Sequence, residues 1–124
     1  MIAGGDHYLN PIPEVLVKAS CPLGGGIGGC REDVCGLVTG GILIMGAIWG
    51  RTSPDEDDKP LYELARRFRQ YFIDRFDTSV CDPIRKSFPE SEKPCAPLVE
   101  DATRLLITMI EEAAQDEPFR SKKK

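Results

Sequence analysis

The feature that most limits how this chain can fold is an apolar run of 16 residues without a charge, from Val34 to Trp49. A helix formed by this run would be apolar on nearly every face, so it would have to be buried. The run is shorter than the roughly 20 residues that cross a bilayer core, and four glycines interrupt it. We therefore expect a central buried helix from about Glu32 to Trp49, followed by a left-handed glycine cap at Gly50, and no membrane insertion.

Four other segments are expected to be helical. Residues 60–76 and 96–115 each carry an apolar stripe at helical spacing, and residues 13–20 and 81–87 form two shorter helices. No segment alternates apolar and polar residues for long, as a strand would. The predicted fold is all-α, a small helical bundle around the buried glycine-rich helix. We expect a single domain over residues 1–124, with flexible ends at 1–10 and 117–124.

Glycines are frequent both in the segment before the central helix and within that helix. Residues 24–29 contain five glycines, which excludes a stable helix or strand and predicts a loop that turns sharply or approaches another group closely. Gly36 and Gly40, like Gly46 and Gly50, are four residues apart and share one helix face. Such a face lets a neighbouring helix or a cofactor come close. The candidate cofactor-binding residues are Gly24, Gly25, Gly26 and Gly36.

Three of the five cysteines fall at predicted helix starts. Cys35 lies in the first turn of the central helix, Cys81 precedes an Asp-Pro helix start, and Cys95 precedes the last helix. The unpaired N–H groups at a helix start favour thiolate, which is both the nucleophile and the metal-binding form of cysteine. Three helix starts that converge would form a pocket for a sulfur-rich centre, which the glycine loop could wrap with N–H donors. Alternatively, these cysteines are three unrelated small apolar residues of the core.

Other familiar sites find little support. There is no Cys-x-x-Cys pair, which argues against a zinc knuckle, a thioredoxin motif and a c-type haem site. The lone His7 lies outside the main helices and is not expected to be a ligand. Gly24, Gly26 and Gly29 match G-x-G-x-x-G, but no strand precedes them and no acidic residue follows about 20 positions later, so dinucleotide binding is not indicated.

Composition narrows the function classes and the compartment. The chain has 124 residues and a net charge of −4, which argues against nucleic-acid binding, since that depends on Lys and Arg contacts to phosphate. A secreted disulfide scaffold usually has a signal peptide and an even number of cysteines. The N-terminus has no secretory pattern, and five cysteines are present. We expect a cytoplasmic protein.

The order of these motifs resembles the C_GCAxxG_C_C family of small redox-active proteins from bacteria and archaea. The resemblance is carried by Leu23-Gly24-Gly25-Gly26-Ile27-Gly28, by Cys35-Gly36-Leu37-Val38-Thr39-Gly40, and by the later Cys81 and Cys95. It implies that Cys35 is the cysteine of the central motif and that Cys81 and Cys95 are the two C-terminal cysteines. The family is associated with oxidoreductases and with an iron–sulfur or other prosthetic group.

The sequence departs from the family pattern at two places. Leu37 stands where the motif has alanine. The first family cysteine lies on a helix ahead of the glycine loop, and the chain is expected to lack that helix, so Cys30, or else Cys21, would substitute. A missing helix would expose core surface, which a redox partner protein or a second copy in a homo-oligomer, such as a dimer, would cover.

Three hypotheses follow. The first is a redox or electron-transfer accessory protein that binds a metal centre, an iron–sulfur cluster for preference, through Cys35, Cys81, Cys95 and Cys30, because soft thiolates favour such metals. The second is a metal-free thiol–disulfide protein in which Cys35 pairs with Cys81 or Cys95. The third is a structural dimer module with inert cysteines.

Overall fold

The structure is a computed structural model, and it describes residues 2–88, 95–117 and 119–122. Over these residues six α-helices and two short 3₁₀ helices account for the regular structure, which confirms the all-α class. The α-helices are α1 (Ile2–Leu9), α2 (Glu14–Ser20), α3 (Gly36–Trp49), α4 (Lys59–Phe76), α5 (Cys81–Lys86) and α6 (Ala96–Ala114). The 3₁₀ helices are η1 (Cys21–Leu23) and η2 (Phe119–Lys122).

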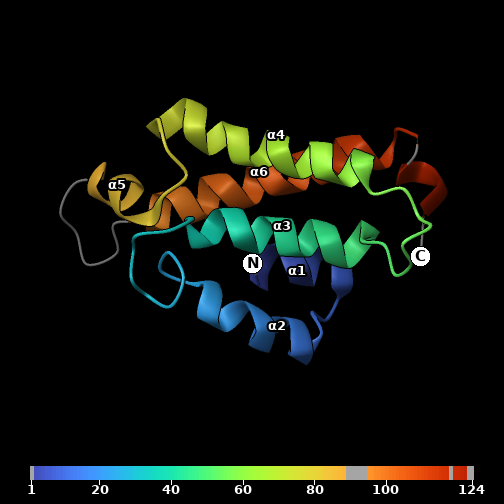
Figure 1. The fold of residues 1–124 in the computed structure, drawn as a ribbon, viewed down its shortest axis with the longest axis horizontal. Coiled ribbons are helices and arrows are strands. Elements are labelled where there is room, and N and C mark those ends of the chain that lie inside the picture. Colours follow the sequence, from blue (N-terminus) through green and yellow to red (C-terminus); the bar gives the residue numbers. More distant parts are fainter. Residues whose placement is uncertain (1, 89–94, 118, 123–124) are drawn as a thin grey trace.

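Helix α3 is the centre of the bundle, as its unbroken apolar sequence predicts. It packs against α4, α1 and α6, and α2 lies outside it (Figure 1). The start of α3, the glycine-rich loop and α5 share one end of the molecule, whereas the end of α3 and η2 share the other. We call these the thiol end and the aromatic end. The site described below lies at the thiol end.

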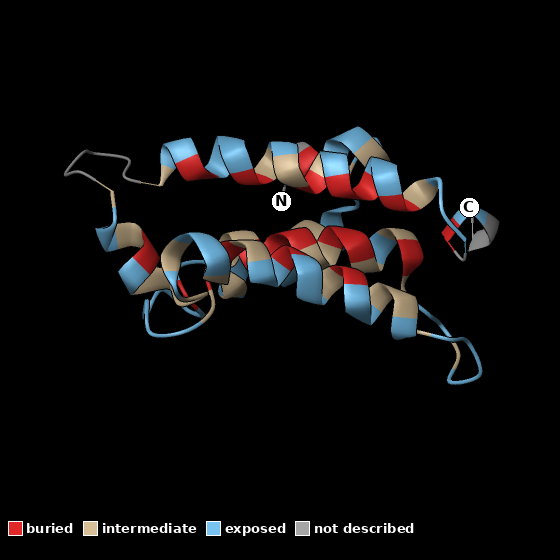
Figure 2. Ribbon diagram, turned by 90° about the horizontal axis from the view of Figure 1, so that it is seen from above, coloured by how far each residue is buried: buried red, intermediate tan, exposed pale blue. Residues whose placement is uncertain are grey.

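The core is formed by the apolar faces that the helices turn toward one another (Figure 2). In α4 the buried positions are Leu64, Phe68 and Phe72, which are members of the stripe predicted from the sequence. At the aromatic end, the Trp49 and Phe119 rings pack with their centroids 4.5 Å apart. Burial of large apolar side chains contributes roughly 1.5–3 kcal/mol each, so this packing supplies most of what holds the bundle together.

The two chain ends contain helices where we expected no regular structure. Helix α1 occupies residues within 1–10, and its buried Gly4 and Gly5 lie against side chains of α6, α3 and Ile12. Two adjacent glycines lower helix propensity, which is why the sequence suggested a loose end, but here they permit close packing. Near the other end, Phe119 of η2 is 8% exposed.

The glycines of α3 differ in what they allow. A Cβ at Gly41 would lie 2.4 Å from the Phe68 ring, so α4 approaches α3 at this residue. Gly46 has no neighbour within 4 Å of that position, and the close approach predicted there is wrong. Gly50 has φ −61° and ψ 145°, so the predicted left-handed cap is also wrong and the chain leaves the helix in an extended conformation.

Helix α3 begins at Gly36, later than the predicted start at Glu32. The reason is that the preceding residues form backbone hydrogen bonds with a distant segment instead of with the helix. Val34 pairs with Val80 in an isolated antiparallel bridge, and Cys35 is the N-cap residue of α3. The carboxylate of Asp33 consequently caps the Val34 N–H and does not lie in the first helical turn.

Candidate thiol site

A short backbone clasp brings the segment before α3 to the start of α5. The Cys35 N–H donates to the Ser79 carbonyl at 2.7 Å, and the Cys81 N–H donates to the Asp33 carbonyl at 2.8 Å. These two bonds flank the Val34–Val80 bridge. Cys35 and Cys81 are therefore diagonal neighbours on the same side of this two-stranded contact, because successive side chains of extended backbone point to opposite faces.

Cys95 completes a group of three thiols, which we call the thiol cluster. It is the N-cap residue of α6, whereas Cys35 caps α3 and Cys81 is the first residue of α5. The charges on Cys81 and Cys95 each raise the pKa of Cys35, and the charge on Cys95 raises that of Cys81. The structure thus brings together at one end the three cysteines that the sequence placed at helix starts. All are free thiols.

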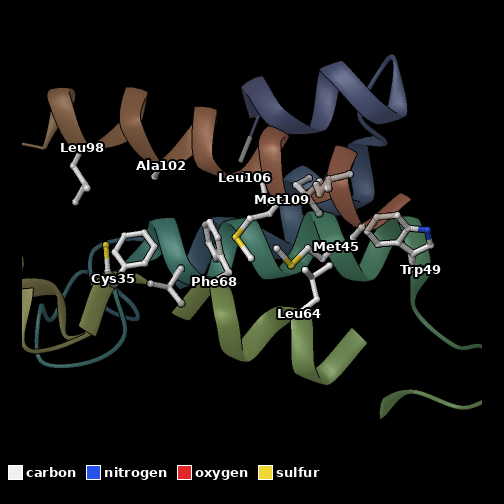
Figure 3. Packing of buried hydrophobic residues seen from close by; sticks show 14 of the residues in the cluster. Cys35, Met45, Trp49, Leu64, Phe68, Leu98, Ala102, Leu106 and Met109 are labelled. Carbon is white, nitrogen blue, oxygen red and sulfur yellow. The ribbon is translucent and has the colours of Figure 1, made fainter. Parts of the chain in front are cut away.

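Burial controls the chemistry of Cys35. Its residue is 7% exposed, and Figure 3 shows its sulfur at the edge of the apolar core. Desolvation raises the pKa of the Cys35 thiol, although the backbone N–H groups of Leu37 and Val38 lower it. The helix start thus favours thiolate, as expected from the sequence, but the loss of hydration is the larger effect on the pKa. Burial therefore favours the protonated thiol at Cys35.

Cys81 has a more polar environment. Desolvation, the neighbouring Cys95 and the Asp82 carboxylate raise its pKa, the charges of Arg31 and Arg85 partly oppose this, and the net shift of the pKa is upward. Arg85 is one helical turn beyond Cys81 on α5, and the Arg31 carbonyl accepts the Asp82 N–H at 2.9 Å. Cys81 is half-buried, so a reagent reaches it more readily than it reaches Cys35.

The glycine-rich loop is a left-handed turn. Five consecutive residues, Gly25 to Gly29, have φ between 59° and 72°. Glycine adopts this conformation freely, whereas an L-residue with a side chain loses about 1–2 kcal/mol there. Ile27 is the one member with a side chain, and its φ is 68°. The sharp turn predicted from the composition is confirmed, and its handedness explains why glycine fills four of the five positions.

The loop packs directly on the thiol cluster through Gly26, which is buried. A Cβ at Gly26 would lie 2.7 Å from the Cβ of Cys81 and 2.9 Å from the Cα of Arg31. A Cβ at Gly36 would lie 3.5 Å from the Cα of Gly24. The glycines proposed as cofactor contacts, Gly24, Gly25, Gly26 and Gly36, thus lie where the loop meets α3 and Cys81.

The loop uses most of its own hydrogen-bond donors internally. The N–H groups of Gly28 and Gly29 donate to the carbonyls of Pro22 and Gly24, at 2.7 and 3.1 Å. The Arg31 N–H likewise donates to Gly25 at 2.8 Å. A cavity of about 80 Å³ lies between the loop and α3, well below the roughly 300–1,000 Å³ of typical ligand pockets. The loop thus acts here as packing against the thiol cluster.

The remaining candidate ligands are exposed. Cys30 is exposed, and its Sγ donates to the Gly26 carbonyl at 2.9 Å. Cys21 is exposed on η1. The Nε2 of His7 lies 3.8 Å from a carboxylate oxygen of Glu111, on the contact of α1 with α6.

The described residues do not form a metal ligand set. Within residues 2–88, 95–117 and 119–122, no group of three or more His, Cys, Asp and Glu is placed to hold a metal ion. The residues as they stand do not fit an iron–sulfur cluster or a zinc ion.

Comparison with known protein families agrees with the order of these motifs. One family model, described as "Putative redox-active protein (C_GCAxxG_C_C)", matches residues 1–109. The chain belongs to this family. No curated protein and no solved structure matches the chain. In this C_GCAxxG_C_C protein, no helix of the described residues is long and apolar enough to cross a membrane.

Several residues of the site were not singled out from the sequence. Arg31 and Arg85 act on Cys81, and Val34 and Val80 form the bridge that positions two of the thiols. Arg85 is the fourth residue after Cys81, so helical spacing could have indicated it. The bridge had no such signal, because a single residue pair produces no alternation in the sequence.

Proposed function

We propose that this C_GCAxxG_C_C protein is a metal-free thiol–disulfide redox protein whose working unit is the thiol cluster. The observation that carries the proposal is the backbone clasp that holds Cys35 beside Cys81, at the end of the bundle where Cys95 caps α6. Cys81, which like Cys95 is half-buried, is the attacking thiol in this proposal, and Cys35 is the buried thiol that closes an internal disulfide with it or with Cys95.

The exchange has two steps that balance. The thiolate of Cys81 attacks a disulfide of the oxidised substrate, forming a mixed disulfide and releasing one substrate thiol. A second thiol of the cluster then attacks the Cys81 sulfur, which releases the other substrate thiol and leaves an internal disulfide. Two protein thiols are oxidised and one substrate disulfide is reduced, with the two protons transferred to the substrate sulfurs.

The clasp indicates how the internal bond would close. Diagonal neighbours in an antiparallel pair are roughly 7–8 Å apart. The Cα atoms of a disulfide are usually about 4.4–6.8 Å apart. Cys35 and Cys81 therefore need a small approach of their two segments, which a contact of one bridged pair resists less than a full sheet would.

The iron–sulfur hypothesis rests on the same cysteines together with Cys30. The family description is compatible with a metal or cluster cofactor. Against it stand the exposed position of Cys30 and the absence of a ligand group of three in the described parts of the chain. Stoichiometric iron and acid-labile sulfide in anaerobically prepared protein would replace our proposal with an electron-transfer role through a cluster.

The proposal carries further expectations. A thiol–disulfide protein needs a redox partner protein to reoxidise or reduce it, and free thiols suit a reducing compartment such as the cytoplasm. A homo-oligomer remains a prediction, and light scattering at several protein concentrations tests it.

The test is differential alkylation of the protein before and after oxidation by glutathione disulfide. Alkylated thiols are located by peptide mass spectrometry, and metal content is measured on the same sample. We expect an internal disulfide within the thiol cluster, with a loss of two mass units. Cys35→Ser and Cys81→Ser should each leave mixed glutathione adducts or other pairings instead.

Matched controls are Cys21→Ser and Cys30→Ser, because both thiols are exposed and lie outside the cluster. Both variants should form the internal disulfide as the parent protein does. The proposal is wrong if the cluster stays reduced at a glutathione redox poise that oxidises ordinary dithiols, or if Cys21 or Cys30 supplies the disulfide.

A further inference from the structure

The left-handed turn presents an exposed apolar side chain beside the redox thiols. Ile27 lies at φ 68° and is 40% exposed. β-Branched residues rarely occupy this conformation, and glycine, which fills the rest of the turn, would be free of strain there. Neither the burial of Ile27 nor the geometry of the backbone explains an isoleucine, so its side chain serves an outward contact.

A second strained residue follows in the same loop. Arg31 has φ 65°, is exposed, and is held to the start of α5 by the bond from the Asp82 N–H. Of the described non-glycine residues at positive φ, only Asp77 lies elsewhere, in the C-cap of α4. The loop therefore displays one apolar and one cationic side chain, both in an unfavourable conformation.

Both side chains belong to the loop that touches Cys81. Gly26, which precedes Ile27, is packed against the Cβ of Cys81, and Arg31 acts electrostatically on the same residue. Arg85 adds a second positive charge from α5. The Asp82 carboxylate opposes them at Cys81, although it pairs with Lys86 at 2.8 Å, and the Asp33 carboxylate caps the Val34 N–H.

From this arrangement we infer that Ile27 and Arg31 form a docking surface for a disulfide-bearing protein segment with an apolar residue and a carboxylate beside its cysteine. This inference rests on the proposed function and names its substrate class. The apolar side chain of the partner covers Ile27, its carboxylate pairs with Arg31, and its disulfide is thereby brought to Cys81. The step is the thiol–disulfide exchange balanced above.

The experiment measures exchange of the reduced protein with four synthetic peptide disulfides. The cysteine is flanked by leucine and glutamate, by leucine and serine, by serine and glutamate, or by serine on both sides. Rates are read by quenching with acid and separating the peptide thiol. We expect the leucine–glutamate peptide to react at least fivefold faster than the serine–serine peptide.

Two variants assign the contacts. Ile27→Asn replaces isoleucine with a residue that tolerates positive φ. The thermal midpoint of the variant should therefore not fall, while its preference for leucine peptides disappears. Arg31→Gln should remove the preference for glutamate and leave that for leucine. Val15→Asn is the matched control, since Val15 is 73% exposed on α2, and it should change neither preference.

Glutathione disulfide separates this inference from the proposed function. If glutathione disulfide oxidises the cluster but the four peptides react equally, the docking surface is wrong and the thiol–disulfide function stands. If Arg31→Gln slows glutathione disulfide more than any peptide, the cations bind small anionic disulfides, and a protein partner is excluded. If no disulfide reacts at all, the proposed function fails as well.

Discussion

The two ends of α3 are built by different means. At the thiol end, Cys35 is positioned by backbone hydrogen bonds and by a loop of glycines that offers almost no side chains. At the aromatic end, Trp49 packs on Phe119, and large apolar surfaces are removed from water. Figure 3 shows both ends along the same helix. The difference teaches that stability and reactivity can be altered separately in this bundle.

The largest expected effect is on the aromatic end. Trp49→Ala should lower the free energy of unfolding by about 3–5 kcal/mol, because a buried aromatic residue is replaced by a cavity. Denaturant titration of the parent protein and the variant measures this difference in the free energy of unfolding. The exchange rate of Cys81 per folded molecule should not change. A changed rate would mean that the two ends are coupled through α3.

Gly26→Ala is the corresponding change at the thiol end. Its Cβ would meet Cys81 at 2.7 Å and its φ is 71°, so both crowding and backbone conformation are unfavourable. We expect the free energy of unfolding to fall by about 1–3 kcal/mol, as is usual for substitutions that overpack a site. Unlike Trp49→Ala, it should also change the alkylation rate of Cys81. Gly28→Ala is the control. A Cβ at Gly28 would have no neighbouring atom within 4 Å, so this variant has only the cost of the positive φ and no crowding.

The buried thiol at the thiol end should also make the stability of the protein depend on pH. The pKa of Cys35 is raised by burial, so folding favours its protonated form. The stabilisation is fully present below the ordinary pKa of a cysteine thiol and is lost as the pH rises through the raised value. Stability should therefore decline above about pH 9, and Cys35→Ala should reduce this decline in parallel chemical denaturations. Tyr8, with its pKa raised to about 12 by burial and by Glu111, contributes only at still higher pH.

The smallest expected effect on stability comes from an ion pair that we assign to neither end of the bundle. Arg75 of α4 and Asp101 of α6 form an ion pair at 3.2 Å with both side chains partly exposed. A double-mutant cycle with Arg75→Gln and Asp101→Asn should give a coupling of about 0.2–1 kcal/mol, and the coupling should weaken with added salt. A larger coupling would show that α4 and α6 depend on this pair more than on their apolar faces.

The helices were predictable where the sequence repeats an apolar stripe. The expected helix at 60–76 is α4, and that at 96–115 is α6, with ends within one residue. Helix α1 was missed because its glycines oppose a helix locally, and only packing against α3 and α6 compensates. Tertiary context also sets the start of α3, which the clasp delays to Gly36.

The cysteines of the site could be predicted from the sequence, but the effect of their surroundings on the thiol pKa could not. Helix starts and the family resemblance indicated Cys35, Cys81 and Cys95, and the structure places these three near one another. The helix start favours thiolate at Cys35, but burial opposes it, and burial depends on neighbours that are distant in sequence. The roles of Arg31 and Ile27 depend on backbone dihedral angles, which composition alone does not determine.

The Val34–Val80 bridge has a consequence for the order of events during folding. It joins segments on either side of α3 and α4, so the ends of a long chain segment must meet before Cys35 and Cys81 become neighbours, at an entropic cost that local helices do not carry. An oxidant that reaches the chain earlier finds five sulfurs with no native preference among them. If the thiol cluster works by the proposed thiol–disulfide exchange, correct pairing requires that helix docking precede oxidation.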